Sequence, residues 1–372
     1  MKKILPFFIV LTAACSGKTS MTQYSISDFG AESAVECTLA LQTAIDRASQ
    51  EGGGRVTVPA GEYLTRTIYL RDGVDLHLEK GAVLKGVEDA GCYDHFIPQS
   101  DLTRYDSGGG TANANCVGDT VWMKALIIGA GINGASITGE GTIDGRHVFN
   151  PDGEEGMRGP HTIVIAEAKD FRMEGIHITC AANYAFLGYA LDSPVFDNLS
   201  ITEGWDGIHI RGARNGVIKN CRLETGDDCI AGGYWENMVI KDCSINSSCN
   251  GIRMIMPSDG VEVCDCEFFG PGKYPHRTSG EARRNNMLFG IVLEPGSWGA
   301  APGELKNIYL HDLNMHDLSS AVSTSVREGC EAYDLRLENI KASHLTGSTS
   351  PVVSWLDKGF KNITVTNCSF SK

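Results

Sequence analysis

The sequence predicts an all-β fold, namely a single-stranded right-handed parallel β-helix with an N-terminal capping helix. A motif of the form apolar-x-Asn/Asp-apolar-x-apolar recurs from "FRMEGIHI" to "ITVTNCSF", and self-similarity at a fixed short period is typical of solenoids. The repeats consist of short alternating runs rich in Val, Ile and Cys, punctuated by Gly and Asn, with no helical 3.6-residue pattern. The regular leucine frame of leucine-rich repeats is missing from the sequence.

The first fifteen residues, "MKKILPFFIVLTAAC", are expected to be a lipoprotein signal peptide. Two lysines, a short apolar run and small residues precede Cys15, which is typical of an export signal, and the run is too short to cross a bilayer. "LTAAC" resembles a bacterial lipobox, which predicts lipidation of Cys15 and an outer-membrane lipoprotein that faces the periplasm or the cell surface. Plain secretion is the alternative.

Residues 16–372 are expected to form one β-helix domain, whose N-terminal end is closed by a helix over residues 39–50. The segment "LALQTAIDRASQ" places Leu41, Ala44, Ile45 and Ala48 on one face. A solenoid needs such a cap because its first coil has no neighbour to cover it.

One position of the repeat should stack inside the solenoid from coil to coil. It carries Ile176, Leu199, Cys221, Cys243, Cys266, Leu313, Ile340 and Cys368. The period is nearly constant up to Cys266, one long interval then leads to Leu313, and the last two steps are slightly longer than the first ones. The three central cysteines are interpreted as a buried ladder rather than as disulfides or a metal site.

The segment 87–120 is Gly-rich and does not follow the repeat. It contains Cys92 and Cys116, and a disulfide between these two is plausible in an exported protein.

A formal net charge of -14 excludes nucleic acid as an expected partner, because phosphate binding needs a basic surface. We expect a monomer that meets the membrane through its lipid anchor only.

Three carboxylates are expected to converge when the period is applied to "WDGIHI", "DDCIAG" and "CNGIRM". Asp206, Asp228 and Asn250 are separated by equal steps of one period, and they should stack on neighbouring coils about 4.8 Å apart. The ladder one residue earlier holds Trp205, Asp227 and Cys249. Like charges this close raise the pKa of at least one group, and glycoside hydrolysis needs one protonated carboxyl and ionised partners. A Ca²⁺ site and a solvated acidic ridge are the alternatives.

The segments "GWDGIHI", "TGDDCIAGG" and "SSCNGIRM" resemble the core of the family 28 glycoside hydrolases, the polygalacturonases and their relatives. The likeness extends upstream through "YSISDFGAESAVECTLALQTAIDRASQ" and "ITGEGTIDG" and covers about residues 24 to 260. It implies that Asp227 is the general acid, that Asp206 and Asp228 position and deprotonate the water, and that the anomeric configuration is inverted.

The chain departs from the family pattern at positions whose residues bind the sugar in that family. Asn250 stands where the family has a histidine. The family's Arg-Ile-Lys motif is best matched by "GIVLEP", so Val292 and Glu294 occupy the places of two cations that hold a galacturonate carboxylate. Plain polygalacturonic acid is therefore a doubtful substrate.

Five residues are expected to bind substrate beside the carboxylates. They are Asn250, Arg253, His209, Trp205 and Arg283. Arg283 belongs to the basic segment "PGKYPHRTSGEARRNN" in the long interval, which could replace the missing cations. His209 is expected either to contact the sugar or to tune the acid. For Arg253 and Arg283 a surface location, and for His209 an ordinary structural role, are the alternatives.

The expected function is hydrolysis of a pectin-like or other acidic polysaccharide or its oligosaccharides, without a cofactor or metal. Exo action is expected because the inserts at 87–120 and 267–287 could close one end of the groove. A Ca²⁺-dependent polysaccharide lyase on the same fold and a non-catalytic glycan-binding surface lipoprotein are the alternatives.

Overall fold

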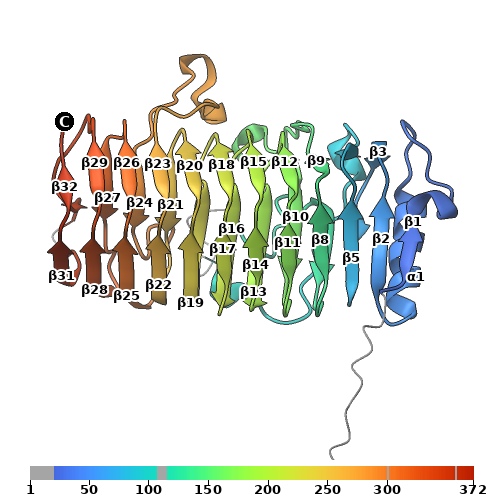
Figure 1. Ribbon diagram of the computed structural model, residues 1–372, viewed down its shortest axis with the longest axis horizontal. Helices are drawn as coiled ribbons and strands as arrows, with labels where there is room; N and C mark the ends of the chain where they lie inside the picture. Colours follow the sequence, from blue (N-terminus) through green and yellow to red (C-terminus); the bar gives the residue numbers. More distant parts are fainter. Residues whose placement is uncertain (1–20, 107–114, 300, 357) are drawn as a thin grey trace, which may run out of the picture.

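The computed structural model describes residues 21–106, 115–299, 301–356 and 358–372, and it confirms the parallel β-helix. Its strands stack side by side along the long axis of the molecule (Figure 1), and each named strand of the described residues pairs in parallel with its neighbours. Cys15 and the signal segment lie outside the described residues, so the lipoprotein hypothesis stays a prediction.

The coils present three strand faces, which we call A, B and C in the order in which the chain meets them. Face A contains β1 (Gln23–Ser25), β2 (Gly54–Val58), β5 (Val74–Leu78), β8 (Ser136–Gly139), β11 (Arg172–Glu174), β14 (Val195–Asp197), β17 (Val217–Lys219), β22 (Ser258–Cys264), β25 (Gly303–His311), β28 (Cys330–Glu338) and β31 (Lys361–Thr366).

Face B is a separate sheet. It contains β3 (Gly61–Thr65), β6 (Ala82–Gly86), β9 (Thr142–Asp144), β12 (His177–Thr179), β15 (Ser200–Thr202), β18 (Arg222–Thr225), β20 (Ser244–Ser247), β23 (Glu267–Phe269), β26 (Asn314–His316), β29 (Lys341–Ser343) and β32 (Ser369–Phe370).

Face C joins face A through the long strand β19 (Ile230–Lys241), which pairs with strands of both. Face C also contains β4 (Ile68–Tyr69), β7 (Ala125–Ala130), β10 (His161–Ala166), β13 (Phe186–Asp192), β16 (Ile208–Arg214), β21 (Asn250–Met254), β24 (Phe289–Leu293), β27 (Ser320–Thr324) and β30 (Val353–Ser354).

The register of the coils confirms the period read from the sequence. On face A, Met173 pairs with Phe196, Phe196 with Ile218 and Ile218 with Ile240, so each partner lies one period further along the chain. The long interval is a single coil enlarged by a loop, because Val263 pairs directly with Leu310. The three central cysteines of the predicted ladder, Cys221, Cys243 and Cys266, are buried free thiols.

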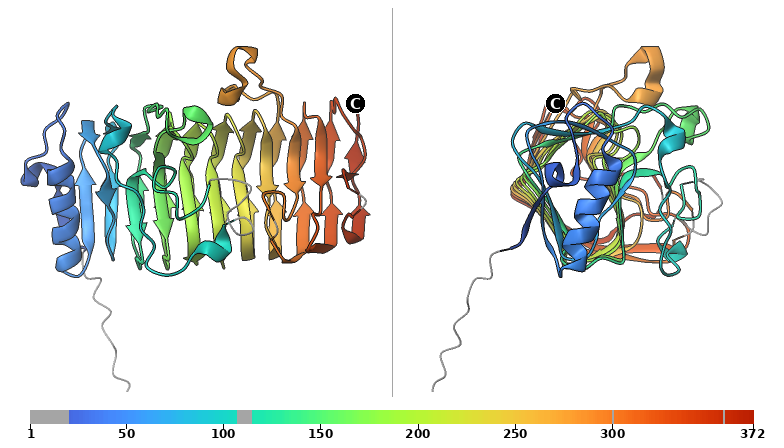
Figure 2. Two further views of the ribbon diagram at one scale, coloured as in Figure 1. Left: turned by 180° about the vertical axis from the view of Figure 1, so that it is seen from behind. Right: turned by 90° about the vertical axis from the view of Figure 1, so that its right-hand side faces the viewer.

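Helix α1 (Thr38–Gln50) lies across the N-terminal end of the solenoid (Figure 2, right). Its buried face contains Leu41, Ala44, Ile45 and Ala48, so the predicted cap is confirmed. Among the described residues no helix is long and apolar enough to span a bilayer.

The insert between β6 and β7 packs against the outside of face C. Phe96, Leu102, Val117 and Trp122 form a second apolar cluster there with strands β7, β10 and β13. The insert contains η2 (Ala90–Cys92) and η3 (Thr103–Tyr105), and the other short helices are η1 (Ile26–Phe29), η4 (Glu154–Gly156) and η5 (Arg277–Ala282).

The disulfide between Cys92 and Cys116 was a wrong prediction, because both thiols are free. A bridge between His95 and Lys124 folds the insert back on itself, which brings the neighbourhood of Cys92 to the start of β7 rather than to Cys116.

Candidate active site

The candidate active site lies in the turns that lead from face B to face C. Asp206 precedes β16, Asp227 and Asp228 precede β19, and Asn250 begins β21. Because Ile208, Ile230 and Ile252 pair in sequence, Asp206, Asp228 and Asn250 occupy equivalent positions on three coils. Carboxylate oxygens of the three aspartates lie within 4.8 Å of one another, so the convergence read from the sequence is confirmed.

The backbone around these carboxylates is fixed by small residues and hydroxyl groups. A Cβ atom at Gly207 would lie 2.5 Å from the carbonyl oxygen of Cys229 on the next coil, so only glycine allows this close approach. The hydroxyls of Thr225 and Ser247 both donate to the carbonyl oxygen of Asp227 at 2.7 Å. The turn that carries the aspartate pair is therefore held from two coils.

Asp227 lies between two cationic or hydrogen-bonding groups. Its Oδ2 is 3.6 Å from Nη2 of Arg158 and 3.5 Å from Nε2 of His276. Burial alone would raise the pKa of Asp227, but the hydrogen bond with His276 and the charge of Arg158 outweigh it and lower the pKa to about 2. Asp227 is therefore ionised in the free protein.

Asp228 has the opposite environment. Burial raises its pKa to about 6, against the charge of Arg253, and the neighbouring charge of Asp227 adds to the rise. Its Oδ1 accepts a hydrogen bond of 2.8 Å from Nδ2 of Asn250, and Nη1 of Arg253 lies 3.5 Å from its Oδ2. Because the three carboxylates interact this strongly, their protons belong to the group as a whole.

Asp206 is bound to a buried relay of Arg211 and His209. Nε of Arg211 donates to Nε2 of His209 at 3.3 Å, and an arginine can only donate. Burial and Arg211 hold the pKa of His209 well below its usual value, so the neutral ring carries its hydrogen on Nδ1 and donates it to Oδ2 of Asp206 at 2.7 Å.

The relay also affects the pKa of Asp206. Burial and the charges of Asp227 and Asp228 raise the pKa of Asp206. The hydrogen bond that Asp206 accepts from His209 works against this rise. Asp206 and Asp228, whose pKa values are both raised, are therefore the carboxyls that share the retained proton.

The relay is anchored by the insert. Nη1 of Arg211 donates to Oδ1 of Asp106 at 3.3 Å and to the carbonyl oxygen of Asn115 at 2.6 Å. It also donates to the hydroxyl of Tyr189 at 3.0 Å. The insert thereby holds the guanidinium that orients His209.

Trp205 and His209 are covered and do not contact a sugar as expected, although the hydrogen bond of His209 to Asp206 fits the acid-tuning role that was also expected of it. Trp205 is 1 % exposed: its Nε1 donates to the carbonyl oxygen of Ala182 at 3.1 Å, and the guanidinium of Arg158 lies 3.7 Å from its ring centre. His209 is fully buried under Trp298 and Tyr184, which both stack on its ring. Inserted segments cover both side chains, so neither presents a face to substrate.

The other three expected binding residues have different environments. Asn250 is buried and positions Asp228. Arg253 is partly exposed and also donates from Nε to Oε1 of Glu294. Arg283 is exposed at the left-handed end of η5. From the same basic segment it is His276 that reaches the carboxylates.

Sequence reasoning missed Arg158, Arg211 and a covering role for Trp298. Arg158 is buried and pairs with Glu154 at 3.5 Å and Glu155 at 3.0 Å, all within one loop. Arg211 occupies an outward position of β16 that becomes buried only under the insert. Trp298 is half-buried, and the guanidinium of Arg253 lies 5.5 Å from its ring. No periodic signal marks any of the three.

The carboxylates as a set could also bind a hard cation, since their oxygens lie close enough to share one. The guanidinium groups of Arg158 and Arg253, 3.6 and 3.5 Å away, already supply positive charge there. This arrangement suits acid–base chemistry better than a Ca²⁺ site.

Comparison with known proteins agrees with the β-helix fold. The family model described as "Right handed beta helix region" matches residues 127–286. A probable polygalacturonase of Vitis vinifera is 27% identical over 228 residues, which cover 56% of this chain and 43% of that protein. The match therefore spans less than half of this relative's length.

Solved structures share the whole architecture. The family 28 exopolygalacturonase of Yersinia enterocolitica superposes with a TM-score of 0.68 at 17% identity, covering 94% of this chain and 71% of that one. The polygalacturonase of Erwinia carotovora ssp. carotovora gives a TM-score of 0.62 at 16% identity, covering 97% and 99%. At these identities the likeness establishes the right-handed β-helix fold.

Proposed function

We propose that this chain, a divergent relative of the polygalacturonases, hydrolyses a glycosidic bond in a pectin-like or other acidic polysaccharide or its oligosaccharides. The observation that carries the proposal is the group of three carboxylates with opposed protonation, held within 4.8 Å by coil register. Such a group supplies both a proton and a base at one place.

Asp227 is the general acid in this mechanism. Its side chain is 15 % exposed, against 3 % for Asp228 and 4 % for Asp206, so it is the carboxyl that best reaches a glycosidic oxygen. A sugar that displaces His276 removes the hydrogen bond that lowers the pKa of Asp227. The proton shared by Asp206 and Asp228 then passes to Asp227, which donates it to the leaving oxygen.

Asp206 and Asp228, both ionised after this transfer, bind the attacking water. One of them takes the water proton while the water oxygen bonds to the anomeric carbon and the glycosidic bond breaks. The expected product is the inverted anomer. The oxygens are closer than the separation of about 6.5–9.5 Å usual in inverting enzymes, which fits a water held beside the acid by two bases rather than opposite a single one.

Exo action is proposed from the position of the inserts. The insert on face C covers the coils on the N-terminal side of the carboxylates and ends against Arg211, while the loop of residues 146–158 places Arg158 beside Asp227. A chain end fits such a partly closed site better than the middle of a polymer.

The test of the function is an activity screen over pectic, rhamnogalacturonan and algal glycans. We expect new reducing ends without ultraviolet absorbance, unaffected by a chelator, and the inverted anomer as the first product in NMR spectra. An unsaturated product that absorbs in the ultraviolet would instead identify a lyase. Binding without cleavage would identify a glycan-binding protein.

The pH dependence follows from the carboxylate group. Because the pKa of Asp227 is about 2 and that of Asp228 about 6, with that of Asp206 raised as well, the group keeps a transferable proton at pH 4 and loses one as the pH rises through 6. We expect kcat/KM to be level near pH 4 and to fall about tenfold per pH unit above 6. A rate that stays constant up to pH 8 would contradict the assignment.

Glu294 is expected to select against a carboxylate on the reacting sugar. Arg253 is shared between Glu294 and Asp228, so it is not free for a uronate. Replacing Glu294 with glutamine should release Arg253 and lower KM for uronate-terminated oligosaccharides about tenfold, the value of one charge-assisted hydrogen bond. The matched control Glu331→Gln, on an exposed residue paired with Lys361, should leave KM unchanged.

A further inference from the structure

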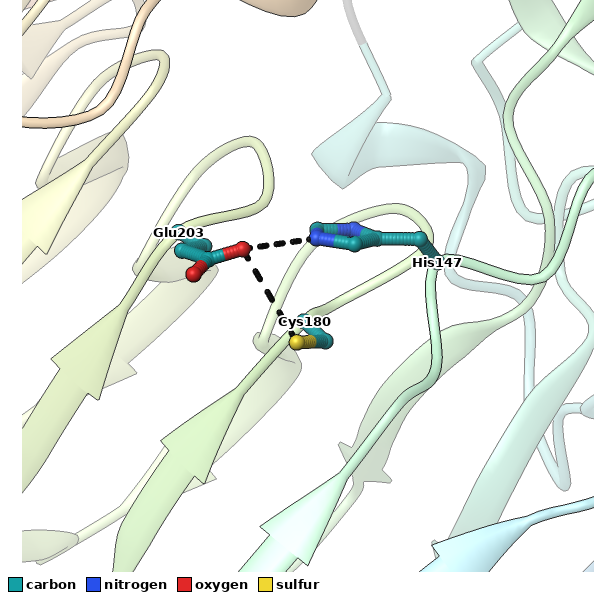
Figure 3. A group of neighbouring side chains, drawn as sticks. All are labelled: His147, Cys180 and Glu203. Carbon is teal, nitrogen blue, oxygen red and sulfur yellow. Dashed lines mark hydrogen bonds and ion pairs between the residues drawn. The ribbon is translucent and has the colours of Figure 1, made fainter.

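His147, Cys180 and Glu203 form a second cluster on three successive turns between faces B and C, the last of which also carries Asp206 (Figure 3). Nε2 of His147 lies 2.8 Å from Oε2 of Glu203, and the same oxygen lies 3.8 Å from Sγ of Cys180. All three side chains are partly exposed. The mechanism proposed above does not use them.

The solenoid brings these side chains together by register. Thr179 pairs with Thr202 and with Asp144, so Cys180 and Glu203 follow at the same position on adjacent coils. Both have left-handed backbone conformations, with φ of 52° and 66°, and so has His147, with φ of 50°. Cys180 and Glu203 therefore leave face B at equivalent positions, and His147, three residues after Asp144, reaches the same place from the coil before.

The donor set and its spacing fit a borderline divalent metal ion. Imidazole nitrogen, thiolate sulfur and carboxylate oxygen are the ligands that zinc uses in proteins, often three from the protein with water as the fourth. Bonds of about 2.0–2.3 Å place tetrahedral ligands about 3.3–3.6 Å apart. The three donor atoms already lie within 4.8 Å of one another, so small side-chain shifts are enough to match this spacing.

Among the described residues there is one other cluster of histidine, cysteine and carboxylate side chains outside the active site. Its histidine has no ring nitrogen with a free lone pair. In the group of Glu262, Cys264 and His311, both nitrogens of His311 face carboxylates, Asp312 at 2.6 Å and Glu262 at 2.9 Å. These hydrogen bonds raise the pKa of His311 against the effect of burial, so both of its nitrogens are donors.

The third cluster, of Asp227, Cys249 and His276, overlaps the active site. Arg158 already lies 3.6 Å from Asp227. Nδ2 of Asn250 donates to Sγ of Cys249 at 3.4 Å. A metal ion there would compete with these contacts.

Arg277 and a metal ion exclude each other at His147. Nη1 of Arg277 donates to Nδ1 of His147, so in this state the ring hydrogen is on Nε2 and points to Glu203. A metal bound at Nε2 moves that hydrogen to Nδ1, where it would meet the hydrogens of the guanidinium. Arg277 must leave before the metal enters.

We propose that His147, Cys180 and Glu203 form a binding site for Zn²⁺ or a similar divalent ion, and that Arg277 occupies this site in competition with the metal. Cys180 binds as thiolate and releases one proton to solvent, while the charges of thiolate and carboxylate balance those of the ion. Metal entry frees Arg277, which directly follows His276, the residue that contacts Asp227.

The site is tested on the full-length protein by Co²⁺ titration, followed by the thiolate-to-cobalt charge-transfer band. We expect one equivalent to bind, Zn²⁺ to displace it, and Cys180→Ser to abolish the band, while Cys249→Ser and Cys264→Ser retain it. A band that survives in Cys180→Ser, or that is lost in Cys249→Ser, overturns the assignment. The readout needs no substrate, so it is independent of the proposed hydrolysis.

The competition is tested with Arg277→Ala, which should raise Co²⁺ affinity at least about tenfold. Arg222→Ala is the matched control. Arg222 lies one coil further on than Glu203 and pairs with Glu224 of its own strand, so the Co²⁺ affinity of this variant should equal that of the wild type. Equal affinities for all three proteins would overturn the exclusion by Arg277.

A further measurement uses only the wild type, so its result does not depend on whether the variants fold. Zn²⁺ should protect Cys180 from alkylation, as measured by mass spectrometry of its peptide, and should leave the exposed Cys92 reactive. Alkylation of Cys180 at the same rate with and without Zn²⁺ would overturn the site.

Discussion

Replacing Asp227 with asparagine is expected to lower kcat/KM for glycan hydrolysis by about a thousandfold or more, within the range that general acid catalysis supplies. Asparagine has almost the same shape as aspartate and can still contact Arg158 and His276. It cannot pass a proton to the leaving oxygen. The loss should appear in kcat with little change in KM, because the proton transfer takes place in the transition state.

The matched control for this variant is Asp259→Asn, because Asp259 is a residue on the outside of face A that pairs with Lys306. It should keep wild-type rates, and circular dichroism should show both variants folded. Full hydrolytic activity in Asp227→Asn would contradict the mechanism. Unchanged glycan binding in both variants, with no hydrolysis in either, would support a binding protein.

Replacing Arg211 with methionine is expected to lower the free energy of unfolding by about 3–5 kcal/mol, the usual result of removing one partner from a buried ion pair. The side chain is fully buried and contacts Asp106, Asn115, Tyr189 and His209. Methionine fills much of the volume but leaves the carboxylate of Asp106 without its counter-charge. It also frees the ring of His209 to carry its hydrogen on Nε2, so the hydrogen bond to Asp206 no longer favours the ionised base.

Urea unfolding followed by circular dichroism measures this effect. Arg214→Met is the matched control, because Arg214 lies on the same strand and pairs with Asp192 on the surface, with 61 % of its side chain exposed. Surface pairs contribute about 0–1 kcal/mol. Equal losses in the two variants would contradict the buried role of Arg211.

The fold was predictable because, in a solenoid, the repeat period of the sequence also sets which residues pair on neighbouring coils. Ile208, Ile230 and Ile252 pair in the structure at the spacing that is visible in the sequence. The same spacing placed Asp206, Asp228 and Asn250 together, and neither step required knowledge of side-chain packing.

The expected sugar contacts of Trp205 and His209 were wrong because burial depends on packing that the period does not show. Alternation along a strand tells which side chains leave the interior of a coil, and His209 does point outward from β16. It does not tell whether another segment covers the outer surface. Here the insert and Trp298 cover it, so an outward residue became a buried one.

The electrostatics of the site were only partly visible in the sequence. Crowded carboxylates predict that some pKa is raised, and that holds for Asp206 and Asp228. That Asp227 has a lowered pKa instead depends on Arg158 and His276, which come from loops several coils earlier and later in the chain. Nothing in the local pattern marks these partners.

By itself, the sequence determined the parallel β-helix, its coil length, its capping helix and the convergence of three aspartates, because each follows from a repeat in which equivalent residues stack. Only the tertiary structure decided which aspartates have a raised pKa, which aromatic rings are covered, and that His147, Cys180 and Glu203 lie together with Arg277 beside His147. Those features depend on inserted loops, which follow no period, and on Coulomb interactions, which depend on distance in space rather than along the chain.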